Sequence, residues 1–156
     1  MATASNLIQV MIDATRKAGR KLARDFGEVA ELQVSKKGPA DFVSAADTKA
    51  EQVLVEELSR LRPGYGFLAE ERGAVEGTDK SHRWIIDPLD GTTNFLHGVP
   101  HFAISIALER EKEIIAGVIY QPISDELFWT EKGNGAYVDT PNARSRRLRV
   151  SGRKDP

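Results

Sequence analysis

The stretch 84-WIIDPLDGTTNF-95 places two aspartates, a proline and a glycine directly after an apolar run. The apolar residues 84–86 predict a buried strand, and Asp87 and Asp90 follow it. Pro88 fixes its own backbone and has no N–H to donate, so we expect the strand to end there. Because burying an unpaired carboxylate is costly, the two acids require either solvent or a cation beside them. The stretch therefore predicts a strand end that faces either solvent or a cation, and the rest of the sequence has to decide between the two.

The turn after this strand suits a metal and an anion together. Gly91 permits close approach of the backbone, and we expect Asp90 or Thr92 to cap a short helix. Hard cations such as magnesium take oxygen ligands, commonly one or two carboxylates together with a substrate phosphate. Free N–H groups at the start of a helix bind phosphate oxygens. One loop can therefore hold both groups.

Composition bounds the kind of protein. The 156 residues, 40% of them apolar, are enough for one globular domain spanning residues 1–156. With 22 basic and 23 acidic side chains the net charge is -1, which argues against bulk nucleic acid or an anionic membrane as a partner. The lack of cysteine excludes disulfides and thiolate sites and favours the cytoplasm. Residues 1–17 lack the pattern of a signal peptide, and the longest apolar run, 114–120, is far below the ~20 residues that span a bilayer. We therefore expect a soluble protein.

Two amphipathic helices are predicted before any strand. Apolar residues at helical spacing predict the first over residues 4–26, ending near Gly27. The polar residues 35–39 then interrupt regular structure. Apolar positions over 46–61 predict a second helix that stops before the next proline.

A twofold pattern follows the helices. Large apolar residues alternate with alanine, serine or glutamate over 102–109, and short strands are predicted at 114–120 and 126–130. The turn 133-GNG-135 favours a hairpin before a strand at 136–138. Because the links are short, these strands are expected to be antiparallel neighbours. The sequence therefore predicts an α+β fold, with two N-terminal helices packed on a largely antiparallel sheet.

The segment 144–154 holds six basic residues and no acid. Such a segment can bind the phosphates of RNA, but it contains no aromatic residue for base stacking. Lysine and arginine also commonly protect the edge of a sheet from pairing with another chain. A solvated edge strand is the favoured interpretation.

Five carboxylates are candidates for chemistry, and each has a structural alternative. Ser44 and Asp47 fit a capping box at the start of the second helix. Glu70 and Glu71 follow the short apolar piece 67–69 and fit a solvated loop. The two acids of the opening stretch are harder to explain as structure alone. The candidates are Asp47, Glu70, Glu71, Asp87 and Asp90.

Histidine chemistry is the rival interpretation. His82, His97 and His101 do not form a zinc-binding spacing such as H-E-x-x-H. The sequence also contains no G-x-S-x-G nucleophile elbow and no Walker-type glycine loop. The acids therefore remain the best candidates.

The stretch 87-DPLDGTTNF-95 resembles the signature of the inositol monophosphatase family, a family of magnesium-dependent, lithium-sensitive phosphatases. The resemblance extends to 41-DFVSAAD-47, to 67-FLAEE-71 and to the strands that follow. One departure is local, because Ala-Glu-Glu-Arg at 69–72 replaces the more usual Gly-Glu-Glu-Ser. The resemblance implies the layered α/β sandwich of the sugar phosphatases.

The resemblance also implies a set of metal ligands. Glu70, Asp87 and the backbone carbonyl of Leu89 would bind a first magnesium ion. Asp87 and Asp90 would reach a second ion, and a third, weaker ion would depend on Glu70. The implied cofactor is therefore two or three Mg²⁺ ions in a complete enzyme.

Further residues acquire roles in the same way. Glu70 and Thr92 would polarise the metal-activated water that attacks phosphorus, while Asp90 and the amides of Gly91 and Thr92 would bind the substrate. Asp47 would act near the water shell of the metal, which competes with its capping interpretation. Lys36, in the loop between the helices, is a weaker assignment.

The end of the chain departs from the family. Members of the family continue well beyond this point and carry another metal-binding aspartate in a Trp-Asp motif, together with most contacts to the sugar alcohol. In this sequence Trp84 precedes isoleucine and Trp129 precedes threonine. We therefore expect residues 1–156 to be the amino-terminal part of such an enzyme, and to hydrolyse substrate very slowly alone.

The expected activity is hydrolysis of a myo-inositol monophosphate to inositol and phosphate. Alternative substrates for the same reaction are a sugar bisphosphate, a nucleotide 3'-phosphate and histidinol phosphate. A different class of function is a non-catalytic contact with the transcription or RNA-processing machinery. The resemblance also implies a cytoplasmic homodimer for the complete protein.

Overall fold

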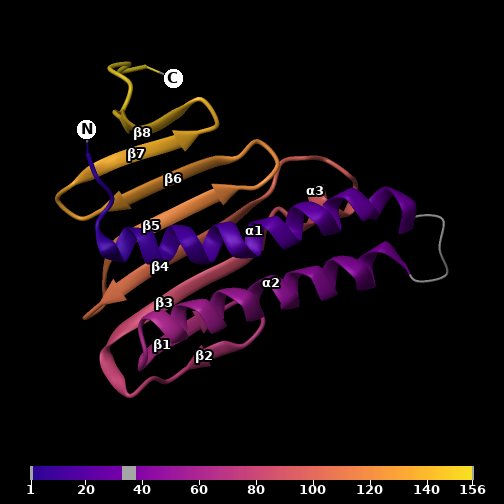
Figure 1. Ribbon diagram of the computed structural model, residues 1–156, viewed down its shortest axis with the longest axis horizontal. Coiled ribbons are helices and arrows are strands. Elements are labelled where there is room, and N and C mark those ends of the chain that lie inside the picture. Colours follow the sequence, from indigo (N-terminus) through magenta and orange to yellow (C-terminus); the bar gives the residue numbers. More distant parts are fainter. Residues whose placement is uncertain (1, 33–37, 156) are drawn as a thin grey trace.

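Two long helices lie side by side on one face of an eight-stranded sheet (Figure 1). This computed structural model describes residues 2–32 and 38–155. Helix α1 spans Asn6–Leu32 and helix α2 spans Pro39–Leu61, and both precede the first strand. The predicted α+β fold, with two N-terminal helices on a sheet, is confirmed.

Helix α1 is held to the sheet by one apolar face. Ser5 caps the helix, because its Oγ accepts the N–H of Ile8 at 3.2 Å. The helix continues past Gly27, so its predicted end is wrong. Val29 is only 1% exposed, and its burial extends the apolar face beyond the glycine. The other members of this face are fully buried: Ile8, Met11, Ala14, Ala18 and Leu22.

Helix α2 begins earlier than the sequence suggested. It starts at Pro39, which the first turn accepts because the N–H that proline lacks has no partner within the helix there. Ser44 and Asp47 therefore lie inside the helix, and the predicted capping box is wrong. The carbonyl of Ser44 accepts the hydroxyl of Thr48 at 3.0 Å. The helix ends at Leu61, before the proline, as predicted.

The sheet has the order β2-β1-β3-β4-β5-β6-β7-β8. All neighbours are antiparallel except β1 and β3, which are parallel. The predicted largely antiparallel sheet is confirmed. The strands are β1 Tyr65–Ala69, β2 Gly73–Val75, β3 Asp79–Asp90, β4 Ala103–Arg110, β5 Glu113–Gln121, β6 Glu126–Glu131, β7 Gly135–Thr140 and β8 Ala143–Leu148.

Strand β3 runs through Pro88, so the expectation that the proline ends it is wrong. Opposite β4, Asp87 pairs with Ser105 and Asp90 pairs with Ala103. Three residue steps on β3 therefore match two on β4, which is the pattern of a β-bulge. A bulge tolerates proline because a residue within it needs no ladder hydrogen bond. The short helix α3, Thr92–Leu96, follows directly.

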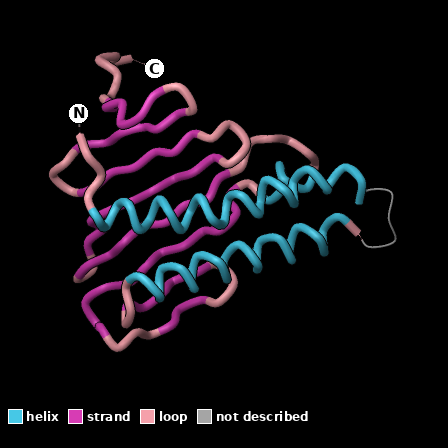
Figure 2. Tube along the Cα trace, in the orientation of Figure 1, coloured by secondary structure: helices cyan, strands magenta, loops and turns pink. Residues whose placement is uncertain are grey.

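The main core lies between the helices and the near face of the sheet (Figure 2). An aromatic cluster at one end joins α1, α3 and the start of β4. The ring centroids of Phe26 and Phe95 lie 5.5 Å apart, and those of Phe95 and Phe102 lie 4.9 Å apart. Phe95 is fully buried. This cluster packs beside the turn that follows Asp87 and Asp90 and so helps to hold it in place.

The far face of the sheet carries exposed apolar side chains. Ile119 is 48% exposed and Phe128 is 38% exposed, whereas their strand neighbours Val118 and Trp129 are buried against the helices. Strand β8 lies at the edge of the sheet, as its basic sequence predicted. None of the described helices is long and apolar enough to cross a membrane.

Candidate active site

The parallel pairing of β1 with β3 brings two of the predicted acids together. Ala69 ends β1 and pairs with Ile86 of β3. Glu70 and Asp87, the residues that follow this pair, therefore lie at the same end of the two parallel strands. Burial, followed by interaction with the neighbouring carboxyl group of Asp87, raises the pKa of Glu70. The parallel pairing therefore places Glu70 beside a second acidic group.

Asp47 reaches the same acids from helix α2. Its side chain is nearly inaccessible, at 5% exposure, and its Oδ1 has no hydrogen-bond partner among the described residues. Burial raises the pKa of Asp47 to about 7, with the charge of Glu70 next in importance and those of Glu71 and Asp87 after it. A buried carboxyl oxygen without a donor costs free energy unless a proton or a cation compensates.

Asp47, Glu70 and Glu71 border a cavity of about 340 Å³ between α2, the end of β1 and α3, and Asp87 is not among its described lining residues. Thr92 and Thr93 line its opposite wall. The structure therefore places three predicted catalytic residues at one cavity. They are Asp47, Glu70 and Thr92.

Asp90 and Gly91 border a different hollow, of about 290 Å³, beside His101 and Gln121. The two hollows lie on either side of one turn, because Gly91 borders this hollow and the next residue, Thr92, borders the first. Of the predicted substrate-binding residues, Thr92 therefore lies in the acid-lined cavity, whereas Asp90 and Gly91 border the neighbouring hollow.

The turn itself depends on a glycine. Gly91 has φ +94°, a left-handed conformation that favours glycine, and a Cβ there would lie 3.1 Å from the carbonyl oxygen of His101. Gly91 is also the N-cap of α3, and within the described residues no side chain caps this helix. The prediction that Asp90 or Thr92 caps it is therefore wrong. The side chains of both remain available for other contacts.

The donor chemistry of the site fits a hard divalent cation. Its side-chain donors are carboxylate and hydroxyl oxygens, and Oδ1 of Asp47 has no hydrogen-bond partner among the described residues. Within residues 2–32 and 38–155, however, no three acidic or histidine side chains converge on one point. Asp87 Oδ1 accepts the N–H of Leu89 at 3.2 Å and so is already engaged. The site has the ligands that magnesium prefers, arranged as a charged cluster.

The sequence profile of the inositol monophosphatase family matches residues 3–155. The chain belongs to the inositol monophosphatase family. It is 65% identical over 149 residues to an inositol-1-monophosphatase of Mesorhizobium japonicum, which covers 96% of this chain and 54% of that protein. It is 41% identical over 140 residues to the Nus factor SuhB of Vibrio cholerae, which covers 90% of this chain and 52% of that protein.

Solved structures support the same membership. The extragenic suppressor protein SuhB of Bartonella henselae superposes with a TM-score of 0.83 at 58% identity, covering 96% of this chain and 56% of that one. An inositol monophosphatase of Anabaena superposes with a TM-score of 0.77 at 35% identity, covering 96% and 51%. The chain spans about half the length of the curated relatives that it matches.

The other residues considered from the sequence, Lys36 and the three histidines, are not among the described residues that line the acidic cavity. Lys36 falls outside the described residues. His97 contacts the carbonyl of Thr93 through Nδ1. His101 borders the hollow beside Asp90. No described contact joins either histidine to the acidic cluster.

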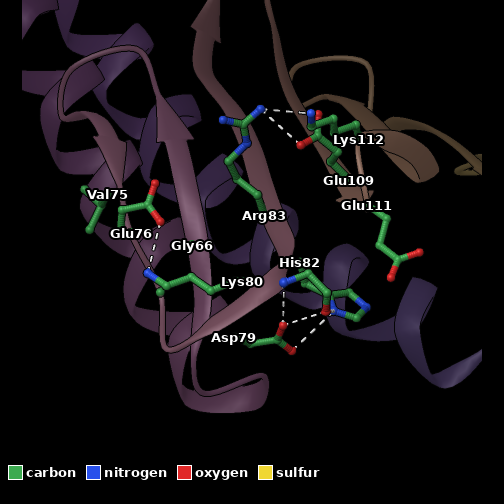
Figure 3. A pocket seen from close by; sticks show the side chains of 12 residues that line it. Gly66, Val75, Glu76, Asp79, Lys80, His82, Arg83, Glu109, Glu111 and Lys112 are labelled. Carbon is green, nitrogen blue, oxygen red and sulfur yellow. Dashed lines mark hydrogen bonds and ion pairs between the residues drawn. The ribbon is translucent and has the colours of Figure 1, made fainter.

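His82 lies near the other end of β3, in a pocket of about 370 Å³ (Figure 3). Its ring stacks on Tyr65 at 4.4 Å between centroids, and its Nδ1 lies 2.7 Å from the hydroxyl of Ser81. Many of the charged side chains in this pocket are paired with one another, as Lys80 is with Glu76 and Arg83 is with Glu109. The pocket is separate from the acidic cluster.

Sequence reasoning missed Glu51, which is 1% exposed and faces the same region from α2. The one signal for it was its spacing, since residues four apart lie on the same face of a helix and Glu51 follows Asp47 by four. Its partners are backbone amides, which no side-chain motif reveals.

Proposed function

We propose that this chain carries the catalytic end of a magnesium-dependent phosphomonoesterase that hydrolyses myo-inositol monophosphate to inositol and phosphate. The observation that supports this most directly is the cluster of acids from three separate elements. Asp47 comes from α2, Glu70 from the end of β1 and Asp87 from β3. Like charges are brought together at this cost where a cation is to be bound.

Magnesium would be held by the carboxylates of Glu70, Asp87 and Asp90 and by the carbonyl of Leu89. When bound, it neutralises charge on the phosphate and acidifies a water molecule. The complete enzyme would use two or three such ions. These ligands explain why the acids gather although no basic side chain is among the described residues that line their cavity.

The chain's other residues would orient the reactants. The amides of Gly91 and Thr92 would bind phosphate oxygens, and Asp90 would bind the substrate. Glu70 and the hydroxyl of Thr92 would orient the attacking water. Asp47, whose pKa is about 7, would hold or release a proton beside it near neutral pH. Much of the catalysis would then be positioning in a charged cavity.

The names of the relatives favour an inositol phosphate among the possible substrates, because the Mesorhizobium and Caulobacter proteins are named inositol-1-monophosphatase. The test is Mg²⁺-dependent phosphate release from inositol 1-phosphate, a sugar bisphosphate, a nucleotide 3'-phosphate and histidinol phosphate. We expect the first to be hydrolysed fastest by a protein that contains this chain at the length of its relatives. Absence of Mg²⁺-dependent release from all four would overturn the proposal.

We propose further that residues 1–156 are the amino-terminal part of such a protein, and that the complete protein is a cytoplasmic, lithium-sensitive homodimer. The two-ion site would lack a ligand in the 156-residue chain, so we expect this chain to bind about one magnesium ion and to turn over very slowly. Calorimetric Mg²⁺ binding and phosphate release should be measured for the 156-residue chain and for the complete protein. Equal turnover of the two proteins would contradict the proposal that the shorter one lacks a metal ligand.

A second function has support from the relatives named Nus factor SuhB, at 38–42% identity. It is a contact with the transcription machinery, with or without phosphatase activity. Phosphate release separates the two functions, because a pure binding protein has no need of Glu70, Asp87 and Asp90 together. A Glu70→Gln variant that loses turnover but keeps binding to transcription proteins would show that both coexist.

A further inference from the structure

A buried carboxylate on helix α2 anchors the turn that carries Glu70. Glu51 accepts the backbone N–H of Glu71 at 2.8 Å through one oxygen and that of Arg72 at 3.2 Å through the other. The guanidinium Nε of Arg72 lies 3.3 Å from the same carboxylate. The Glu51 side chain is 1% exposed, so these bonds form away from solvent.

The anchored turn is short. Strand β1 ends at Ala69 and β2 begins at Gly73, so residues 70–72 make the whole link. Two of the three amides in the link are bonded to Glu51. Pairing of Ala69 with Gly73 closes the hairpin, but it does not tie the turn to α2. The bonds from Glu51 do so.

The same helix presents Asp47 one turn before Glu51. The anchoring bonds therefore fix the distance between two acids that come from different elements, Asp47 on α2 and Glu70 at the end of β1. Packing of buried apolar side chains such as Phe67 also holds β1 in the core, but packing does not specify direction as hydrogen bonds do.

We propose that Glu51 is a positioning residue for the metal and phosphate site, acting through the backbone of Glu71 and Arg72 on the carboxylate of Glu70. The inference rests on the proposed function. Groups that orient metal ligands from behind typically change metal affinity about 10- to 100-fold when they are removed. The two amide bonds carry the role rather than the ion pair, because the side chain of Arg72 is 43% exposed and solvent weakens that pair.

The test is calorimetric Mg²⁺ binding to the 156-residue chain and to Glu51→Gln. Glutamine keeps the shape and one acceptor oxygen, but it places an NH₂ group where the second amide must be accepted. We expect Mg²⁺ affinity to fall about 10-fold or more. Hydrogen exchange at the amides of Glu71 and Arg72 should become faster, which reports the lost anchor without any metal.

Glu56→Gln is the matched control. Glu56 lies exposed on the same helix and accepts a hydrogen bond from Gln52, so the variant makes the same change of charge away from the turn. It should bind Mg²⁺ as the unaltered chain does. Glu70→Gln should lose binding and serves as the positive control for the site.

A folded Glu51→Gln protein that binds Mg²⁺ with unaltered affinity would overturn the positioning role, even if its melting temperature had fallen. In that outcome the proposed function survives, because the unaltered chain still binds the metal and Glu70→Gln does not. No Mg²⁺ binding by the unaltered chain would overturn the positioning role and the expectation that this chain binds about one ion, whereas the proposed function is judged by phosphate release from the longer protein. If Glu51→Gln does not fold, Glu51→Asp carries the same test, since it keeps the charge but withdraws it by one methylene group.

Discussion

Ala69 pairs with Ile86 in parallel register, and this pairing places Glu70 beside Asp87. Parallel neighbours end at the same edge of a sheet, whereas the antiparallel pairs elsewhere in this sheet end at opposite edges. One parallel pair within an otherwise antiparallel sheet is therefore enough to concentrate the acids. The bulge in β3 then turns the chain so that Asp90 follows on the same edge.

Asp87→Asn should remove phosphatase activity from the full-length protein and leave the fold intact. The change withdraws a proposed metal ligand and relieves repulsion with Glu70, and it empties no part of the core. We expect turnover to fall roughly 100-fold or more, the scale of losing one electrostatic group at a transition state. The measurement is phosphate release over a range of Mg²⁺ concentrations, with circular dichroism to check folding. Near-normal turnover at limiting Mg²⁺ would show that Asp87 is not a ligand.

Glu70 should matter more than Glu71. Neighbouring residues at a strand end point in different directions, and it is Glu70 whose pKa is raised by burial and by the neighbouring Asp87. Turnover of Glu70→Gln and Glu71→Gln should be measured separately, because the two variants change the same charge at adjacent positions. A larger loss at position 71 would mean that the wrong acid has been assigned to the metal.

Gly91→Ala should destabilise the chain by more than its backbone strain alone. A left-handed conformation costs a residue other than glycine about 1–2 kcal/mol. At Gly91 the added Cβ would also lie 3.1 Å from the carbonyl oxygen of His101 and 3.3 Å from Cα of Phe102. Gly98 has φ +70°, and no atom lies within 4 Å of its added Cβ. The Gly98→Ala variant therefore measures the free-energy cost of the left-handed backbone without a steric contact. Urea unfolding of both variants should show a larger loss at Gly91, and equal losses would refute the close contact.

Acid should weaken the attachment of α1 to the turn before β6. Burial raises the pKa of Asp125, but hydrogen bonds from Arg16 at 2.7 Å and Tyr120 at 3.0 Å outweigh it, so the pKa lies below its ordinary value. A lowered folded-state pKa adds stability above the ordinary pKa of the group, and this stability is lost as the pH falls through the folded-state pKa. The carboxylate is 39% exposed, so we expect no more than about 1 kcal/mol.

The variant that checks this is Asp125→Asn, because asparagine also tolerates the left-handed backbone found there, with φ 52°. Unfolding free energies should be measured from neutral pH down to acid pH. The difference between the two proteins should shrink as the pH falls. A constant difference would mean that the ionised carboxylate of Asp125 contributes nothing.

Much of this architecture could be predicted because helices and strands leave periodic patterns of apolar residues within short segments of sequence. The alternation over 102–109 and the helical spacing before Gly27 are set by which face of each element is buried. Pro88 misled the prediction because the bulge that accommodates it exists only against β4, a partner that sequence alone does not display. The start of α2 was misplaced for a similar reason, since a polar first turn carries little periodicity.

The candidate site also contains residues that the sequence could identify and residues that it could not. Asp87 and Asp90 could be found because they share a short motif with a proline and a glycine. Asp47 had two interpretations, and only the true start of α2 removed the capping one. Glu51 was invisible, because its partners are backbone amides about twenty residues later along the chain. Contacts between a side chain and a distant backbone leave no pattern in residue types.

The 156-residue chain should associate with itself through the far face of the sheet. Ile119 and Phe128 are directly paired there and are 48% and 38% exposed. They lie beside a hollow of about 210 Å³ that is also lined by Ala107, Gly117 and Ala136. Exposed apolar side chains that are contiguous favour burial against another surface. Ile119→Lys should therefore lower the concentration-dependent mass measured by sedimentation. Ile123→Lys is the control, because Ile123 is 40% exposed but lies in the turn after β5. If both variants associate as the unaltered chain does, the far face is not the surface that joins the copies.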